Sequence, residues 1–273
     1  MLGFGLNQVT MANASIDEFI ESAARLGMVG VELRNDLGRP IFDGRSVECV
    51  RQKLQDHGLR LLGLSQVYPF NRWTSDIADG VRALIDLAVE AGAETISLIP
   101  CNDGTGIDAA SRQNDLANAL EGCLPLLETA NMVALVEPLG FTRSSLRSKV
   151  ELVAAIETLG ADSYFRLVHD TFHHTLSGGG PFYPGQTGIV HISGVNDADV
   201  PVEQMEDDHR VLIDANDRLG NVDQIMALRD AGYKGAFSFE CFSPDIHRHP
   251  SLEDAIRTSM NFISSQLQKE IAA

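Results

Sequence analysis

The sequence is poor in basic residues and lacks the features that mark several protein classes. It has 21 Lys and Arg against 38 Asp and Glu, which gives a formal net charge of −17. Such a negative field repels phosphate backbones and anionic lipid headgroups, so we expect neither a nucleic-acid nor a membrane partner. No apolar run approaches the ~18 residues that a membrane-spanning helix requires.

Cysteine is scarce, and the four that occur form no CxxC pair. The opening residues MLGFGLNQVT contain no basic stretch followed by an apolar one, which a secretory signal peptide would show. These absences predict a reduced protein with a cytoplasmic location. We interpret Cys49, Cys101, Cys123 and Cys241 as small buried hydrophobes rather than as catalytic groups.

Short apolar runs alternate along the chain with longer amphipathic segments. The expected strands are Leu2–Leu6, Val29–Leu33, Arg60–Ser65, Thr95–Ile99, Met132–Val136, Phe165–His169, Gly188–Ile192 and Ala236–Phe239. The expected helices are Ile16–Leu26, Val47–His57, Ile77–Ala91, Asp108–Ala130, Lys149–Leu159, Val222–Ala231 and Leu252–Gln268. Continuous apolar strands separated by helices indicate parallel pairing under a helical layer.

The boundaries repeat one pattern, in which a helix ends at a glycine and a strand follows, as in AARLGMVGVEL and AVEAGAETISL. Glycine accepts the left-handed conformation that a helix C-terminus needs. Eight strands within 273 residues predict a single (β/α)8 TIM barrel with a parallel eight-stranded barrel, a fold of about 250 residues. We expect one domain over residues 1–273. Between strands six and seven, Thr171 to Thr187 is poor helix material, which predicts a short helix or an irregular crossover.

Four consecutive strands end in side chains that can bind a metal. The active site of such a barrel lies at the carboxyl ends of its strands. The strand ends ALVEP, RLVHD, IVHIS and FSFEC supply Glu137, Asp170, His191 and Glu240. Converging buried carboxylates repel one another unless a cation lies among them. We therefore interpret the four as ligands of one divalent metal ion rather than as members of separate ion pairs.

The ligand set and the alternation of side chains allow two further expectations. Three carboxylates and one imidazole suit Mn²⁺, with Mg²⁺, Co²⁺ or Zn²⁺ as alternatives, and leave positions for substrate oxygens. Because successive side chains of a strand face opposite sides, His169 is predicted to face the helix layer, away from Asp170.

The same segments carry a family resemblance that covers nearly the whole chain. Four segments resemble, in order, the metal-ligand segments of the xylose isomerase-like TIM barrels, in the sugar phosphate isomerase/epimerase superfamily. They are VEPLGF, HDTFHH, VHISG and SFECF. That family contains inosose isomerases, hydroxypyruvate isomerases and ketose 3-epimerases. The chain is most similar in character to the IolI-like inosose (2-keto-myo-inositol) isomerases. After His191 it reads ISGVND, which departs from the usual acidic continuation.

The resemblance implies a divalent-metal-dependent isomerase in carbohydrate metabolism, acting on a small sugar or keto-polyol as in inositol catabolism. It also implies a possible homo-oligomer. His173 in the DTFH run and Arg210 in DHRVLIDANDRLGN are the implied substrate contacts. A capping or surface role stays open for His173, and a surface salt bridge within EDDHR for Arg210. For Glu32 and Gln66, the sequence leaves two roles open: lining the pocket, or a salt bridge or core position.

Isomerisation of a hydroxy-ketone begins with removal of a proton next to the carbonyl, which requires a general base. Glu137 and Glu240 are the candidates, on strands three places apart in the ring of eight. Two bases on opposite sides suit epimerisation, whereas one base suffices for a carbonyl shift. The alternatives are a ketose 3-epimerase, a hydroxypyruvate isomerase, or a dehydratase or decarboxylase with the same metal site. SGGG at residues 177–180 follows strand six, away from the usual phosphate site, so we expect an unphosphorylated substrate.

Overall fold

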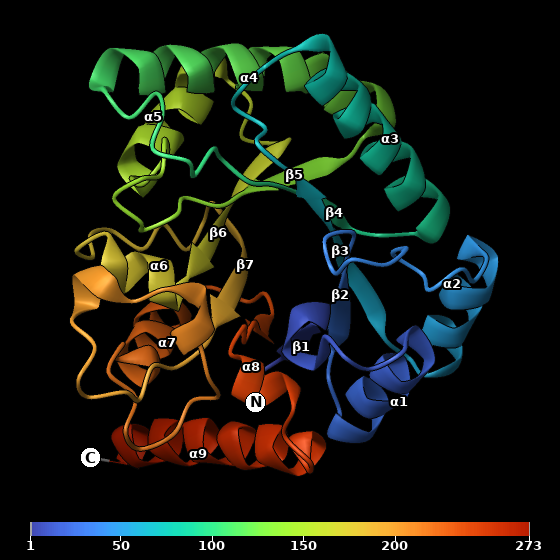
Figure 1. The fold of residues 1–273 in the computed structure, drawn as a ribbon, viewed down its shortest axis with the longest axis vertical. Coiled ribbons are helices and arrows are strands. Elements are labelled where there is room, and N and C mark those ends of the chain that lie inside the picture. Colours follow the sequence, from blue (N-terminus) through green and yellow to red (C-terminus); the bar gives the residue numbers. More distant parts are fainter. Residues whose placement is uncertain (1, 273) are drawn as a thin grey trace.

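The computed structural model describes residues 2–272, and its eight strands close into a barrel (Figure 1). The strands are β1 (Phe4–Asn7), β2 (Gly30–Arg34), β3 (Arg60–Val67), β4 (Thr95–Leu98), β5 (Val133–Val136), β6 (Phe165–Asp170), β7 (Thr187–Ile192) and β8 (Phe237–Phe239). All neighbours pair in parallel, and β8 pairs with β1 to complete the ring. The predicted (β/α)8 barrel is confirmed.

The helices form an outer layer around the barrel (Figure 1). They are α1 (Ile16–Leu26), α2 (Val47–Asp56), α3 (Ser75–Ala91), α4 (Ala109–Ala130), α5 (Lys149–Leu159), α6 (Thr171–Leu176), α7 (Asn221–Asp230), α8 (Pro244–His247) and α9 (Leu252–Ala272). Short 3-10 helices lie at Gln8–Met11, Val202–Gln204 and Asp207–His209. No helix among residues 2–272 is long and apolar enough to cross a membrane.

Local sequence signals explain where the helices begin and end. Ser15 and Glu18 form a capping box at the start of α1, which satisfies backbone N–H groups that have no partner within the helix. Gly27 and Gly92 end α1 and α3 in the left-handed conformation, with φ of 72° and 73°. The predicted pattern of helix, glycine and strand is therefore present in the structure.

The sixth unit is also as expected, since α6 is a helix of six residues directly after β6. Its first backbone donors are capped by Asp170, whose side chain accepts a hydrogen bond from the N–H of His173. The helix therefore starts on one of the predicted metal ligands. This connection fixes the position of His173 relative to the end of β6.

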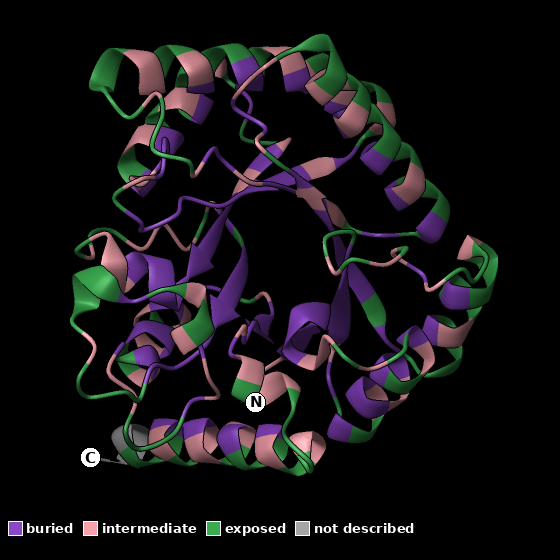
Figure 2. Cartoon of the chain, in the orientation of Figure 1, coloured by how far each residue is buried: buried purple, intermediate pink, exposed green. Residues whose placement is uncertain are grey.

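Burial is concentrated in the strands and on the inner faces of the helices (Figure 2). His169 is fully buried and bonds to Lys149 at the start of α5 and to Gln224 of α7, so it faces the helix layer as predicted. Three of the cysteines are buried as expected. The expectation is wrong for Cys49, which is exposed on the first turn of α2.

Candidate metal centre

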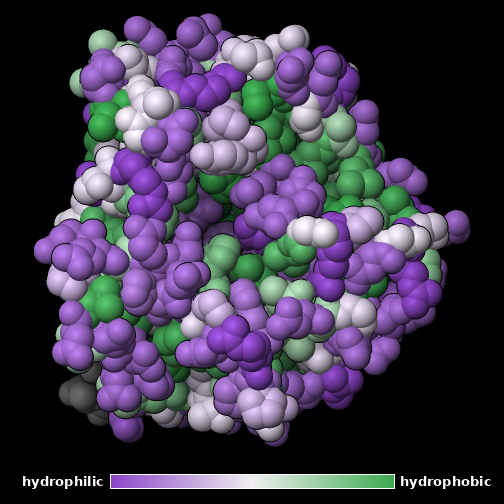
Figure 3. All heavy atoms as spheres, viewed as in Figure 1, coloured by the Kyte–Doolittle hydropathy of each residue, from purple (hydrophilic) through white to green (hydrophobic). Residues whose placement is uncertain are grey.

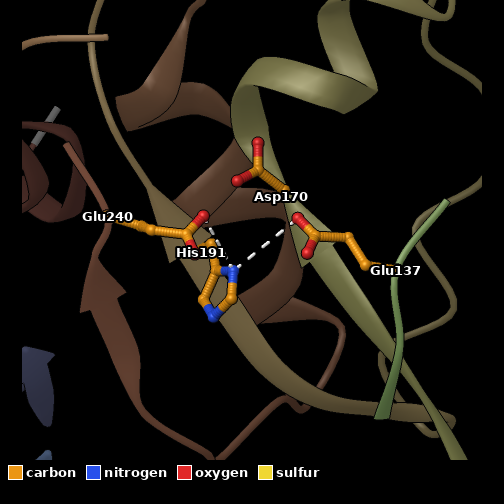
Figure 4. A group of neighbouring side chains, drawn as sticks. All are labelled: Glu137, Asp170, His191 and Glu240. Atoms are coloured by element: carbon orange, nitrogen blue, oxygen red, sulfur yellow. Dashed lines mark ion pairs between the residues drawn. The ribbon is translucent and has the colours of Figure 1, made fainter. Parts of the chain in front are cut away.

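The carboxyl ends of β5 to β8 bring Glu137, Asp170, His191 and Glu240 together (Figure 4). One possible ligand atom of each residue lies within 4.8 Å of the corresponding atoms of the other three. All four residues are buried. Asp170 ends β6, His191 lies in β7, and the two glutamates directly follow β5 and β8. Strand register thus places four ligand-type side chains at one level of the barrel.

Glu32 of β2 fixes the orientation of the His191 ring. The Nε2 of His191 lies 3.0 Å from Glu32 Oε2, and Ser238 Oγ donates to Glu32 Oε1 over 2.5 Å. Because a carboxylate can only accept, Nε2 carries a hydrogen and Nδ1 is the atom turned toward the other ligands. Nδ1 lies 3.2 Å from Glu240 Oε2 and 3.7 Å from Glu137 Oε1, but it has no partner with hydrogen-bond geometry.

This buried, unpartnered nitrogen is what a metal site requires. Burial acts to lower the pKa of His191, but the negative charges of Glu240 and Glu32 outweigh it and raise the pKa well above its usual value. A proton on Nδ1 and a divalent cation can both satisfy these carboxylates. The residues present therefore fit a divalent ion that takes the place of this proton.

Glu137 and Glu240 differ in their surroundings although both are buried. Burial, and then the negative charge of Glu240, raise the pKa of Glu137 to about 7. Among the described residues no hydrogen bond reaches the Glu137 carboxylate, since the 3.7 Å to His191 Nδ1 is too long. Glu137 is therefore a carboxyl group that can hold or release a proton near neutral pH.

Glu240 instead accepts three hydrogen bonds from cationic or amide donors. Asn7 Nδ2 and Arg34 Nη1 donate to Oε1 over 3.1 and 2.8 Å, and Arg210 Nη2 donates to Oε2 over 2.9 Å. Burial opposes ionisation, but the positive charges of His191, Arg210 and Arg34 hold the pKa of Glu240 well below its usual value. Glu240 is therefore a fixed anion in this site.

Arg210 lies among the predicted ligands rather than at the surface. Its side chain is 1% exposed, and Nη2 donates to Asp170 Oδ2 over 2.5 Å as well as to Glu240. Nη1 also lies 3.3 Å from Asp207, within the EDDHR segment. The alternative of a surface salt bridge is wrong, because the guanidinium is buried. The two oxygens that Arg210 bonds, Asp170 Oδ2 and Glu240 Oε2, each keep a second lone pair, so the arginine does not exclude a cation.

His173 borders the same site from α6. Its Nε2 lies 4.0 Å from Glu137 Oε1, and its Nδ1 is buried with no hydrogen-bond partner. Burial, and then the positive charge of Arg210, lower the pKa of His173 to about 3, so the ring is neutral at physiological pH. Phe141 packs edge-on to the ring, with centroids 5.0 Å apart. The surface alternative for His173 is therefore wrong.

A cavity of about 380 Å³ opens beside Glu137, His191 and Glu240, whereas Asp170 does not line it. In the orientation of Figure 1, Figure 3 shows mainly hydrophilic residues around a hollow near the middle of this face. The cavity is lined by site residues described above and by further, mainly polar side chains: Glu137, His173, His191, Arg210 and Glu240, with Arg34, Gln66, Asn102, Arg143 and Phe242. Polar donors and acceptors thus surround a space of the size that holds a small ligand.

Asn7 and Arg34 are site residues that the sequence analysis did not identify. Both end their strands, β1 and β2, so the strand-end rule that found the four predicted ligands could have found them. Glu32, two residues before Arg34, was left open between pocket and core roles. It does not line the cavity but supports His191 from behind.

Replacing Glu32 by glutamine tests its support of His191. The change keeps the side chain's shape but removes the negative charge that receives the Nε2 hydrogen. We expect metal affinity to fall by about 10- to 100-fold, as for other residues that orient a ligand. Calorimetric titration with Mn²⁺ measures it. The control is Glu48→Gln on the exposed surface of α2, and equal affinity in the two variants would contradict the assigned role.

Metal binding is expected to release protons. The pKa of Glu137 is raised to about 7 and that of His191 lies well above its usual value, so both groups hold protons that a cation must displace. Affinity should therefore rise with pH across neutrality. Calorimetry in buffers of different ionisation enthalpy counts the protons released. An affinity that does not change between about pH 6 and about pH 8 would exclude this coupling.

Comparison with known proteins agrees with the fold. The model of the family described as xylose isomerase-like TIM barrel matches residues 20–266. A search of curated proteins finds no match. A xylose isomerase domain-containing protein from Salmonella typhimurium LT2 is 31% identical, with 97% of each chain covered and a TM-score of 0.88.

Two more distant structures share the fold. The IolI protein with a bound zinc atom is 18% identical, with 98% of this chain and 99% of that chain covered and a TM-score of 0.86. A D-allulose 3-epimerase from Methylomonas sp., in complex with D-allulose, is 17% identical, with coverages of 99% and 96% and a TM-score of 0.68. Together with the matched residues, the barrel and its four converging strand ends show that the chain belongs to the xylose isomerase-like TIM barrel family.

Proposed function

We propose that the chain is a divalent-metal-dependent isomerase of a small keto-polyol or sugar, similar to the inosose isomerases, that moves a proton through an enediolate. The observation that carries the proposal is the unequal pair of buried carboxylates, Glu137 and Glu240, in a polar cavity. The family includes isomerases and epimerases, and its neighbours here include proteins described as sugar epimerases.

The proposed metal ligands are Glu137, Asp170, His191 and Glu240, and Mn²⁺ is the proposed ion, with Mg²⁺, Co²⁺ or Zn²⁺ as alternatives. When bound, such an ion supplies positive charge that stabilises negative charge on the substrate's oxygens. The chain's contribution is to fix these four side chains at one level and to exclude bulk water from them. Asp170 and His191 would act as ligands alone.

Glu137 is the proposed general base. Its carboxylate lines the cavity, and no hydrogen bond from the described residues occupies its oxygens, so one oxygen could bind the ion while the other faces a substrate C–H bond. Glu240 is held ionised by Asn7, Arg34 and Arg210, which makes it a weaker base. If only one carboxyl group exchanges a proton, the proton moves on one face of the substrate. This favours isomerisation over epimerisation, which uses two bases.

His173 and Arg210 are the proposed contacts to substrate oxygens. A neutral imidazole has one donor and one acceptor nitrogen, and His173 Nε2 lies near Glu137 on the wall of the cavity. Arg210 keeps one N–H group, on Nη1, beyond those bonded to Asp170, Glu240, Ser193 and Asp207. Both residues would orient hydroxyl groups so that one C–H bond faces Glu137.

Epimerisation is the second candidate, because a second carboxylate, Glu240, also lines the cavity. The descriptions of several neighbours point the same way, since they name a D-allulose 3-epimerase and an L-ribulose 3-epimerase. The two candidates differ in whether Glu240 transfers a proton. A location in the cytoplasm, a single domain over residues 1–273 and a homo-oligomeric state complete the proposal.

One assay distinguishes these reactions. Metal-loaded protein is incubated in D₂O with a panel of inososes and ketoses, and products are analysed by mass and NMR. We expect deuterium at a carbon next to the carbonyl, with no loss of water or CO₂, and no exchange after chelation of the metal. Glu137→Gln should slow exchange by about 10²- to 10⁴-fold, whereas Glu48→Gln should not change it.

The Glu240→Gln variant separates the two candidates. If Glu240 delivers the proton in an epimerase, this variant still exchanges deuterium through Glu137 but forms no epimer. If Glu137 works alone, product formation and exchange change by the same factor, including any loss caused by weaker metal binding to this variant. Loss of water or CO₂ from every active substrate, or no exchange on any substrate with metal bound, would contradict an isomerase.

A further inference from the structure

A second cavity, of about 310 Å³, lies between the first turn of α5 and the segment that follows α6. Arg112, Arg147, Ser148, Lys149, Gly179 and Gly180 are among its lining residues. None of the residues that line it also lines the catalytic cavity. It includes part of the SGGG segment that the proposed reaction does not use.

Lys149 is a buried amine with no anion beside it. The residue is 8% exposed, and no carboxylate of the described residues forms an ion pair with it. Its Nζ instead lies 2.9 Å from His169 Nδ1 and 2.9 Å from His174 Nδ1. A buried ammonium is unfavourable unless an opposite charge is near.

The hydrogen bonds around His169 determine which atom donates. The Nε2 of Gln224 donates to backbone oxygens, including that of Leu219 at 2.9 Å, so its Oε1 accepts from His169 Nε2 over 3.0 Å. His169 Nδ1 is therefore an acceptor, and Lys149 donates to it. An ammonium has three donors, so at least one remains after both imidazoles are bonded.

The charges around the cavity are mainly positive. Arg147 donates to the backbone oxygens of Gly140 and Leu176 and has no carboxylate partner in the described chain. Arg112 forms an ion pair with Glu151, with Nη2 2.7 Å from Oε1. Three cations thus face one acidic group, in a chain whose net charge is −17. A local excess of positive charge in so acidic a protein attracts an anion.

Backbone donors also point to an anion. The cavity lies at the start of α5, where Ser148 Oγ accepts from the N–H of Glu151 and no described residue accepts from those of Lys149 and Val150. Unpaired N–H groups at a helix N-terminus favour anions. On the opposite side, the cavity is lined by Gly179 and Gly180, which both have positive φ. Because glycine has no side chain, only backbone borders the cavity at these two positions.

We propose that this cavity binds a phosphate group, either as inorganic phosphate or as a small phosphate ester. Guanidinium groups match the oxygens of a phosphate, and Lys149 adds a buried point charge. The site is distinct from the proposed catalytic site. His174 contacts Lys149, and the neighbouring His173 lines the catalytic cavity, so α6 joins the two sites.

The ionisation of Lys149 agrees with this assignment. Burial lowers the pKa of its amine to about 7, so without an anion the charged form is disfavoured. Burial also lowers the pKa of His174 to about 4, so that ring adds no positive charge near neutral pH. A bound phosphate would hold the ammonium in its charged form and strengthen its bonds to both imidazoles.

The test uses the full-length, metal-free protein at constant ionic strength. Inorganic phosphate and glycerol phosphate are titrated separately by calorimetry, with chloride as the reference, and thermal midpoints are recorded. We expect one saturable site per chain and a higher midpoint with phosphate. Lys149→Met and Arg147→Gln should each weaken binding by about tenfold or more, whereas Arg51→Gln on exposed α2 should leave it unchanged.

The variants also separate this cavity from the catalytic one. Lys149→Met leaves His169 Nδ1 as a buried acceptor without its donor, so we expect a somewhat lower midpoint than the parent, and this midpoint should not respond to phosphate. Arg34→Met, in the catalytic cavity, should keep phosphate binding. Tighter binding of the ester identifies an ester as the ligand. No saturable binding of either compound, or binding lost in Arg34→Met but kept in Lys149→Met, overturns the proposal.

Discussion

The site depends on one electrostatic constraint, which is that converging buried carboxylates need positive charge among them. Glu137, Asp170 and Glu240 meet where the barrel excludes water, and burial acts to raise the pKa of each. Arg34, Arg210 and a proton on His191 supply positive charge, and a divalent ion can replace that proton. Glu137 receives the least of this charge, and its pKa is raised to about 7. The proposed chemistry follows from that inequality.

Most of the fold could be predicted from the sequence, because its signals are local. Helix C-caps such as Gly27 and Gly92 mark changes from helix to strand, and the strands are mostly apolar and buried. The boundaries differ from expectation by a few residues, since helix ends depend on capping contacts. The short helix α8 (Pro244–His247) was not predicted, because four residues with a proline carry no periodic pattern.

The candidate site could be predicted only in part. The strand-end rule selects residues by type and position, which suffices for Glu137, Asp170, His191 and Glu240. The contacts that give these residues different properties are long-range, as in Ser238 with Glu32 or Asn7 with Glu240. Arg210 lies in the loop between β7 and α7, and only the folded chain shows that its guanidinium bridges two predicted ligands. Such contacts have no local signal.

The position of a bound cation tests the four-residue metal site most directly. Crystals of the protein grown with Mn²⁺ would be measured on both sides of the manganese absorption edge. We expect one anomalous peak, within coordination distance of His191 Nδ1 and of oxygens from Glu137, Asp170 and Glu240. A peak elsewhere, or none at this place while Mn²⁺ is bound to the protein, would contradict it.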